Sequence, residues 1–436
     1  MTRIQSPQTI HDVVDGRAVR SVFQPIVEID SGRVVGYEAL SRGPAGTRWE
    51  SPAVLFADAQ AVGRHLELDW VCRAQAYRAA LAADLDPALT FFVNMEPAAW
   101  RSDCPADLVP VADRAHDRLR VVTEMTERAI AADPSALLAA TGACRAAGWG
   151  VALDDVGADP ASLALMPFVH PDVVKLDMGL LRRPDDPYTA DVVTAVGAYA
   201  ESSGALVLAE GIETAEQVMT ARMMGATLGQ GWYFGRPGPL PAGRRTAGTA
   251  LPLLHVAPAT AAASREHAPT PFSIVTRTRP VVRATKSGLM PLSRRLEALA
   301  AEGRQPPVLL ACFQEERHFT PATARRFSAL AERSPLVAAL AVGLADEPVA
   351  GVRGAHLGPD DPLRGEWNVI VVGPHHAAAL VARDLGDDGP DRERRFEFAV
   401  THDRRLVVEA ARSLLHWLTP VRSGGSPVLT ASGLRA

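Results

Sequence analysis

The feature that most constrains the fold is a regular alternation of apolar runs and amphipathic segments between about residues 21 and 237. The apolar runs are short, nearly continuous and rich in valine and leucine. The intervening segments are rich in alanine and show the spacing of helices that bury one face. Strands of this kind that alternate with helices favour a mainly parallel sheet. Seven or eight such units predict an α/β fold, a TIM-like (β/α)8 barrel.

The pattern also places the individual elements along the chain. Strands are expected at 21–29, 33–40, 89–95, 119–125, 150–156, 172–177, 205–211 and 230–235. The clearest helices are expected at 51–62, 66–83, 135–147, 188–202 and 215–224. Ser51 and Ser135 are expected to cap two of these helices, and Gly204 and Gly225 to end two others.

Polar residues stand where the predicted strands end. They are Glu38, Asn94, Glu124, Asp154, Asp155, Lys175 and Glu210, with Gln230 opening the last strand. The C-terminal ends of barrel strands share one face, and the active sites of such barrels lie there. Clustered carboxylates repel one another unless cations are bound among them. Oxygen ligands at this density suit Mg²⁺ or Mn²⁺, and a two-metal site of this kind is a common device for hydrolysing phosphodiesters.

A series of motifs carries a resemblance to a known family. The motifs "FQPIV", "EALSR", "VNMEP", "TEMTE", "DDVG", "DVVKLD", "AEGIE" and "GQGWYFGRP" follow one another between about residues 22 and 237. In this series the chain resembles the EAL-domain family, the cyclic di-GMP phosphodiesterases of bacterial signalling. The resemblance implies metal-dependent hydrolysis of cyclic di-GMP to linear pGpG, and a homodimer formed through this domain.

The resemblance also implies a role for each polar residue. The residues that would bind the first metal ion are Glu38, Asn94, Glu124 and Asp154. Asp155 would bind the second ion and contact the nucleophilic water, which Lys175 would help to orient. Glu210 would complete the shell around the metal site, and Gln230 would hold a metal-bound water or the substrate. Arg42 would bind a substrate phosphate through its planar fork of donors. The residues that would support the site are Glu127 and Glu213.

The chain departs from the family pattern after the double aspartate. The family usually continues as "DDFGTGYSSL", whereas this chain reads "DDVGADPASLAL", with Val156 for the phenylalanine, Asp159 for the second glycine, and Pro160 after it. A lost glycine and a gained proline stiffen this loop. The alternative to an enzyme is therefore a protein that binds and senses cyclic di-GMP without cleaving it. An interaction scaffold is disfavoured, because it has no use for clustered charge that is not compensated.

Each polar residue also has a plain structural explanation when it is taken singly. Asp154 and Asp155 could form a turn and a helix cap. Lys175 could pair with Asp177 at the surface, and Arg42 could be a surface cation. The joint placement of these side chains at strand ends is what favours a site. The aromatic stretch "GWYFG" is expected to serve barrel packing, with the alternative that one of its rings borders a guanine.

A stretch rich in proline, alanine and glycine separates this region from a second unit. We expect a lead at 1–20, the barrel at 21–240, a linker at 241–270, a smaller α/β domain at 271–420 and a disordered tail at 421–436. In the second unit, strands are expected at 272–277, 306–313, 336–344 and 366–373, and helices at 292–301, 321–332, 376–384 and 404–418.

The second unit resembles the DICT domain, a sensory domain attached to bacterial cyclic di-GMP enzymes and two-component proteins. Its ligand or protein partner cannot be read from the sequence. The candidate ligand contacts are Trp367, Asn368, Thr401, His402 and Asp403, and packing and capping explain them equally well.

Composition limits which partners and which cellular location we expect for the chain. The net charge of −5 comes from nearly balanced acids and bases, which argues against a nucleic-acid polymer as partner. Four scattered cysteines are typical of buried thiols in a reducing compartment. The sequence shows neither the apolar segment of a signal peptide nor a run long enough to span a membrane. We therefore expect a cytoplasmic protein with no membrane partner.

Overall fold

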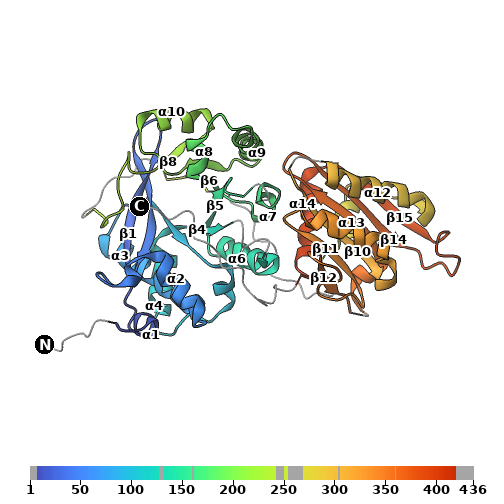
Figure 1. Cartoon of the computed structure of the whole chain (residues 1–436), viewed down its shortest axis with the longest axis horizontal. Helices are drawn as coiled ribbons and strands as arrows, with labels where there is room; N and C mark the ends of the chain where they lie inside the picture. The colour runs from blue at the N-terminus through green and yellow to red at the C-terminus, as the bar shows by residue number, and fades with distance from the viewer. Residues whose placement is uncertain are drawn as a thin grey trace.

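The computed structural model describes residues 7–126, 132–159, 162–241, 250–253, 269–302, 305–358 and 360–418. The N-terminal half forms a closed barrel, and the C-terminal half forms a seven-stranded sheet with helices on both faces (Figure 1). Glu127, Pro160, most of the expected linker and the expected tail lie outside the described residues.

The barrel confirms the predicted fold. Its strands follow one another around the barrel in chain order: β1 Arg20–Glu28, β2 Val34–Arg42, β3 Thr90–Asn94, β4 Arg120–Thr126, β5 Gly150–Val156, β6 Val173–Leu176, β7 Leu206–Ala209 and β8 Leu228–Gln230. Neighbours from β2 to β8 are parallel, whereas β1 is antiparallel to both β2 and β8. The connection between β1 and β2 is a short turn, and a parallel pair needs a crossover of a dozen residues or more.

The helices of this half are α1 Ile10–Asp15, α2 Pro52–Ala61, α3 His65–Ala83, α4 Val109–Arg118, α6 Pro134–Ala146, α7 Met166–Val169, α8 Met178–Arg182, α9 Pro187–Ser203 and α10 Ala215–Met223. Short 3₁₀ turns are η1 Arg48–Glu50, η2 Pro97–Arg101 and η3 Ser162–Ala164. The helices expected from sequence occur within a few residues of their predicted bounds.

Two details of the prediction were wrong, and one was confirmed in part. Asp133, not Ser135, caps α6, because its side chain accepts a hydrogen bond from the amide of Ala136. Ser51 is the N-cap residue of α2, as predicted, but its side chain makes no capping hydrogen bond. The eighth strand ends at Gln230, because the chain then turns at Gly231, where a Cβ would lie 2.1 Å from the carbonyl oxygen of Ile212.

The barrel interior is filled by apolar side chains toward the N-terminal ends of the parallel strands. The side chains that fill it are Ile26, Val35, Phe92, Val122, Ala152, Val173, Leu208 and Leu228. Leu251 packs among them, and its carbonyl accepts a hydrogen bond from Arg120, the first residue of β4. Residues 250–253 therefore cover the N-terminal end of the barrel, and the opposite end is left for polar side chains.

The C-terminal half is an α/β unit whose sheet has the order β12-β11-β10-β13-β14-β15-β9. Its strands are β9 Val282–Thr285, β10 Val308–Glu315, β11 Val337–Val342, β12 Arg353–His356, β13 Glu366–Val372, β14 Ala377–Asp384 and β15 Arg395–Thr401. Its helices are α11 Pro271–Thr276, α12 Lys286–Glu302, α13 Pro321–Ala331 and α14 Arg404–Leu415, with 3₁₀ turns η5 Glu316–His318 and η6 Pro362–Gly365.

Two element types were predicted wrongly in this unit. The expected strand at 272–277 is helix α11, because Thr270 forms a capping box with Ser273 and Pro271 is suited to a first helical turn. The expected helix at 376–384 is strand β14, which lies between β13 and β15 and is buried on both faces. Its alanine-rich run shows no alternation, so periodicity alone cannot separate a buried strand from a helix.

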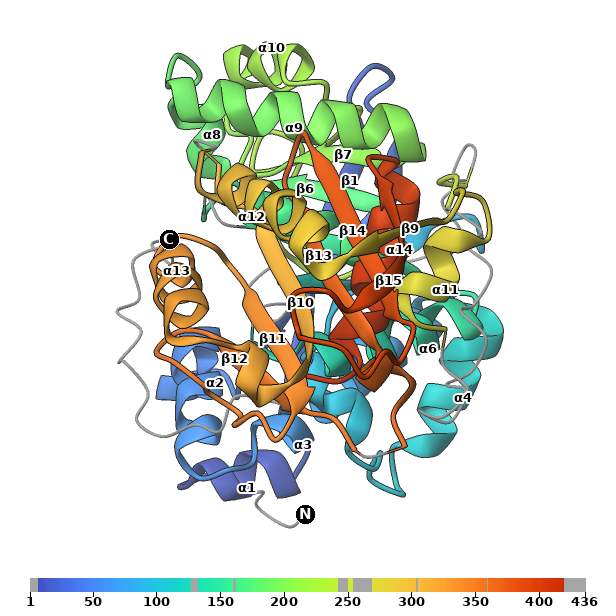
Figure 2. The ribbon, with the colours of Figure 1, turned by 90° about the vertical axis from the view of Figure 1, so that its right-hand side faces the viewer.

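The two faces of this sheet have different neighbours, as Figures 1 and 2 show. Helices α12 and α13 cover one face. Helix α14 covers the other face and also contacts α7 of the barrel. At that contact Arg412 donates a hydrogen bond of 2.7 Å to the carbonyl of Phe168, and buried apolar side chains continue from the barrel into α14. The two halves therefore share a packed interface.

No helix within the described ranges combines the length and the apolar composition that crossing a membrane requires.

A partly buried histidine, His170, follows α7 near Arg412 and makes the interface between α7 and α14 sensitive to acid. Burial, reinforced by Arg412, Arg145 and Arg405, lowers the pKa of His170 to about 4. Protonation therefore favours the unfolded chain as the pH falls from about 6.5 toward 4, because a histidine in water takes up its proton first. We expect wild type to lose about 1–2 kcal/mol of unfolding free energy relative to His170→Asn between pH 6.5 and pH 5, since each pH step of one in this range costs up to about 1.4 kcal/mol.

Asparagine suits this position because His170 has a left-handed backbone, with φ of 51°. Denaturant unfolding at several pH values measures the difference. Replacing the exposed His11 by asparagine is the matched control for the substitution itself. Parallel pH curves for wild type and His170→Asn would contradict the assignment.

Candidate functional site

The predicted polar residues meet at one mouth of the barrel. They line a cavity of about 1200 Å³, to which Glu38, Arg42, Asn94, Glu124, Asp154, Asp155, Glu210, Glu213 and Gln230 all contribute. These residues come from the C-terminal ends of successive strands and from the loops after them. Glu127 is the one predicted site residue that lies outside the described part of the chain.

Lys175 lies beneath this cavity, at the centre of the acids. The distances from its Nζ atom are 2.7 Å to Glu124 Oε1, 2.8 Å to Asp154 Oδ1, 2.7 Å to Glu210 Oε1 and 3.8 Å to Glu38 Oε1. Its side chain is only 1% exposed, which rules out the surface ion pair with Asp177 that was the alternative explanation for this lysine. The chain has only one other lysine, Lys286, and carries the rest of its positive side-chain charge on arginine. A compact ammonium can be surrounded by carboxylates from several directions, whereas a guanidinium is a planar fork.

The acids around Lys175 and the lysine itself shift one another's pKa values. Burial, together with Glu38, raises the pKa of Glu124 well above its usual range, although Lys175 opposes this. Burial likewise raises the pKa of Glu210 to about 8 against the effect of Lys175. Burial disfavours the charge of Lys175, but the surrounding carboxylates outweigh it and raise its pKa. One ammonium cannot neutralise this many carboxylates, so the site favours further cations or bound protons.

The backbone at the end of β5 brings two successive aspartates to the same mouth. Side chains alternate between the faces of a regular strand, so Asp154 and Asp155 would normally point apart. Here the register with β6 is irregular between Leu153 and Val156, and Asp155 has a left-handed backbone, with φ of 56°. Such backbone strain at a non-glycine residue is common at functional sites. One oxygen each from Asp154, Asp155 and Glu210 lies within 4.8 Å of the others.

Two amide side chains complete the cluster. The Gln230 Nε2 atom donates to Glu38 at 2.5 Å, and the Asn94 Nδ2 atom lies 3.4 Å from the other oxygen of Glu38. Among the described groups, the buried oxygens Gln230 Oε1 and Glu124 Oε2 have no hydrogen-bond donor. The donor set therefore consists of carboxylate and amide oxygens, some of them unused, and it fits hard divalent cations such as Mg²⁺ or Mn²⁺.

Sequence reasoning missed residues that hold this arrangement in place. Gln24 pairs with Glu38 in the β1–β2 register, accepts a hydrogen bond from Gln230 at 3.2 Å, and donates to the carbonyl of Gly235 at 3.1 Å. The alternation of side chains along β1 could have identified it, since the position opposite Glu38 faces the same side. Trp232, from the stretch expected to serve packing or to border a guanine, lines the cavity and stacks under Arg236.

A buried ion pair on α3 supports the loop after Asn94. Asp69 and Arg73 lie 2.7 Å apart, and the second oxygen of Asp69 accepts a hydrogen bond from the amide of Glu96 at 2.9 Å. This contact fixes the chain where it leaves β3. The periodicity of α3 places Asp69 and Arg73 four residues apart on one side of the helix, but it does not show that this side is buried.

Comparison with known proteins agrees with the geometry. Residues 8–237 match the family model of the EAL domain, and residues 273–385 match that of a sensory domain in diguanylate cyclases and two-component systems. A probable cyclic di-GMP phosphodiesterase, PdeB of Escherichia coli, is 29% identical over 246 residues, which cover 54% of this chain and 46% of that protein. The cyclic di-GMP phosphodiesterase RocR of Pseudomonas aeruginosa is 27% identical over 240 residues, covering 53% and 61% of the two chains.

Among solved structures, a manganese and cyclic di-GMP complex of BlrP1 from Klebsiella pneumoniae is 29% identical, with a TM-score of 0.45, and the match covers 51% of this chain and 57% of that one. The chain thus spans less than two thirds of each of these relatives. The EAL-domain match itself covers more than half of the 436 residues, and the motifs of the family lie at the strand ends of the barrel. The chain therefore belongs to the EAL domain family.

Proposed function

We propose that this chain hydrolyses cyclic di-GMP to linear pGpG in bacterial second-messenger signalling, with Mg²⁺ or Mn²⁺ as cofactor. The observation that carries the proposal is the cluster of oxygens around Lys175, in which unused carboxylate and amide atoms face a cavity of about 1200 Å³. Two relatives that share the EAL region bear the name cyclic di-GMP phosphodiesterase, which supports the choice of substrate.

The proposal assigns the metal ligands first. The residues that would hold the first ion are Glu38, Asn94, Glu124 and Asp154, and Asp155 would hold the second. Divalent ions bound there would acidify water and offset the negative charge of the phosphate. The unused oxygens of Glu124 and Gln230 and the close approach of Asp154, Asp155 and Glu210 are the features of the chain that support this assignment.

The chain's own side chains would then orient the reactants. Asp155, which is exposed to the cavity, would accept a hydrogen bond from the attacking water and aim it at phosphorus. Lys175 would help to orient the same water, Glu210 would complete the shell around the metal site, and Arg42 would hold the phosphate oxygens. The water oxygen would bond to phosphorus while the P–O bond to one ribose oxygen breaks, and the proton that the water gives up would balance the proton that the released ribose oxygen takes up. Gln230 would hold a metal-bound water or the substrate, and Glu213 and Glu127 would support these groups.

A chromatographic assay of the full chain tests this proposal. We expect pGpG to form with Mg²⁺ or Mn²⁺ and its formation to stop when EDTA is added. Tight binding of cyclic di-GMP in Ca²⁺ or EDTA, without cleavage in Mg²⁺ or Mn²⁺, would instead establish the sensor function. The altered sequence "DDVGADPASLAL" is the observation that keeps this second function open.

We further propose that the C-terminal unit modulates the site through its contact with α7. The chain runs from Asp155 through η3 to α7, and Arg412 of α14 binds the carbonyl of Phe168 there. Strained residues such as Asp155 persist only when the surrounding structure holds them. The docked unit would therefore help to keep Asp155 in its metal-binding position.

Replacing Arg412 by methionine tests this modulation. Because a hydrogen bond from a charged donor contributes about 1.5–3 kcal/mol, we expect its partial loss to raise the half-saturating Mg²⁺ concentration about three- to tenfold. Metal titrations of the hydrolysis rate measure this. The control is Arg277→Met, which removes an exposed ion pair with Glu409 of α14 and should change little. Equal Mg²⁺ dependence in Arg412→Met and wild type would contradict the coupling.

We also propose that the protein works in the cytoplasm as a homodimer. Its four cysteines are free thiols, and Cys72, Cys144 and Cys312 are buried, as suits a reducing compartment. The dimer follows from the family resemblance.

A further inference from the structure

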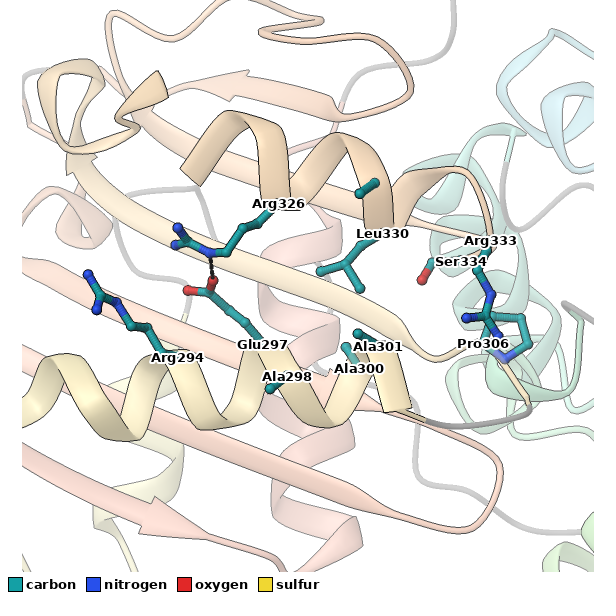
Figure 3. A pocket seen from close by; sticks show the side chains of 11 residues that line it. Arg294, Glu297, Ala298, Ala300, Ala301, Pro306, Arg326, Leu330, Arg333 and Ser334 are labelled. Atoms are coloured by element: carbon teal, nitrogen blue, oxygen red, sulfur yellow. Dashed lines mark hydrogen bonds and ion pairs between the residues drawn. The ribbon is translucent and has the colours of Figure 1, made fainter. Parts of the chain in front are cut away.

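A second cavity, of about 490 Å³, lies between α12 and α13 on the face of the C-terminal sheet opposite to α14 (Figure 3). Small and apolar side chains form its walls: Ala298, Ala300 and Ala301 from α12, Ala329 and Leu330 from α13, and Pro306 from the connection to β10. Polar residues stand at its two ends. Arg294, Glu297 and Arg326 lie at one end, and Arg333 and Ser334 at the other (Figure 3).

The packing of the two helices on the sheet explains the cavity. Helix α13 packs over β11, whereas α12 packs mainly over β13 and β14, with β10 between them. Strands are about 4.8 Å apart, so the helix axes are separated by roughly 12 Å, compared with about 8–10 Å for helices in contact. Alanine on both walls leaves this space unfilled. The groove is therefore a consequence of the fold and needs no local distortion.

One end of the groove carries a positive charge that is not compensated. Glu297 is buried, and Arg326 donates to it at 2.7 Å, so this pair is neutral. The remaining donors of Arg326 are directed to the carbonyl of Ala322 and the hydroxyl of Thr323. Arg294, one helical turn before Glu297, makes no hydrogen bond or ion pair with any described residue. Its neighbour Arg295 is paired with Glu302.

The other end is less favourable to an anion. Both helices end there, at Glu302 and Ala331, and the C-terminus of a helix carries partial negative charge. Arg333 follows α13 and offsets that charge. An anionic group in the groove is therefore favoured beside Arg294.

We propose that this groove binds a carboxylic acid with an unbranched alkyl chain, whose carboxylate pairs with Arg294 and whose chain lies along the alanines. From Arg294 to Ala301 the groove follows α12 for about 10 Å, at 1.5 Å per residue, which suits a chain of medium length. None of the five candidate contacts suggested by the sequence lines this groove. Asn368 donates to Glu366, Asp403 caps α14, and Trp367 and Thr401 are buried away from this groove.

Calorimetric titration of the full chain with decanoate tests the proposal, with the uncharged 1-decanol for comparison. We expect decanoate to bind at least tenfold more tightly than decanol. Arg294→Gln should lose that advantage and leave decanol binding unchanged. Ala298→Leu should weaken both ligands at least tenfold by filling the groove, and the fold should persist because leucine is a good helix former.

Matched controls separate this site from nonspecific binding. Arg295→Gln changes the neighbouring exposed arginine, and Ala322→Leu adds the same volume to α13 outside the groove. Both should bind decanoate as wild type does. Absence of decanoate binding, equal affinity for decanoate and decanol, or affinity unchanged by Ala298→Leu would overturn the proposal. The titration measures binding alone, so its result is independent of whether cyclic di-GMP is hydrolysed.

Discussion

Replacing Asp155 by asparagine is expected to lower kcat for cyclic di-GMP hydrolysis by about a thousandfold or more, with the fold unchanged. Asparagine keeps the size of the side chain and tolerates the left-handed backbone at this position. It removes only the negative charge that would bind the second ion and orient the water. Groups that position or accept a proton in this way contribute about 10²–10⁴ in rate, and the loss of a metal ligand adds to that.

A matched control separates this effect from backbone strain. Asp84 also has a left-handed backbone, with φ of 43°, but it ends α3 away from the site cavity and is exposed. Asp84→Asn should retain wild-type activity. Circular dichroism and unfolding curves should be the same for both variants. An Asp155→Asn protein that keeps more than a tenth of the wild-type rate would contradict the role of this carboxylate.

Replacing Lys175 by methionine should destabilise the metal-free protein by about 3–5 kcal/mol, the usual result when one partner of a buried ion pair is removed. Three carboxylates within 2.8 Å of the ammonium would lose their neutralising charge. For a domain of this size the change corresponds to a fall of roughly 10 °C in Tm. Thermal unfolding in EDTA measures it.

The loss should depend on pH and on metal. It is expected to be larger at pH 9 than at pH 6, because Glu210, with a pKa of about 8, is protonated at the lower pH and repels its neighbours less. Saturating Mg²⁺ should restore part of the stability, since bound cations take over the role of the ammonium. Lys286→Met, at an ion pair in the other half of the chain, should show neither dependence. A Lys175→Met protein as stable as wild type in EDTA would contradict this account.

The sequence was most informative where strands end in polar residues. The barrel follows from the alternation of apolar runs and helices, and the positions of Glu38, Glu124, Asp154 and Glu210 follow from the shared direction of the strands. Their convergence is a property of topology, so it can be predicted without knowing any side-chain contact.

The features of the fold and the site that could not be predicted from the sequence depend on tertiary contacts. Whether residues 376–384 form a helix or a strand is decided by the two strands that flank them, since alanine is compatible with both. The left-handed turn at Asp155 and the position of Lys175 beneath the acids require the packed barrel. The contact of Arg412 with Phe168 joins residues far apart in the chain, and no local pattern marks either of them.

Anomalous diffraction from crystals grown with Mn²⁺ and cyclic di-GMP tests the central claim most directly. The account predicts manganese peaks at the mouth of the barrel, one bound by Glu38, Asn94, Glu124 and Asp154 and one bound by Asp155, with the phosphate beside Arg42. A map without manganese at this mouth, in which the carboxylates point away from one another and the nucleotide lies elsewhere, would contradict it.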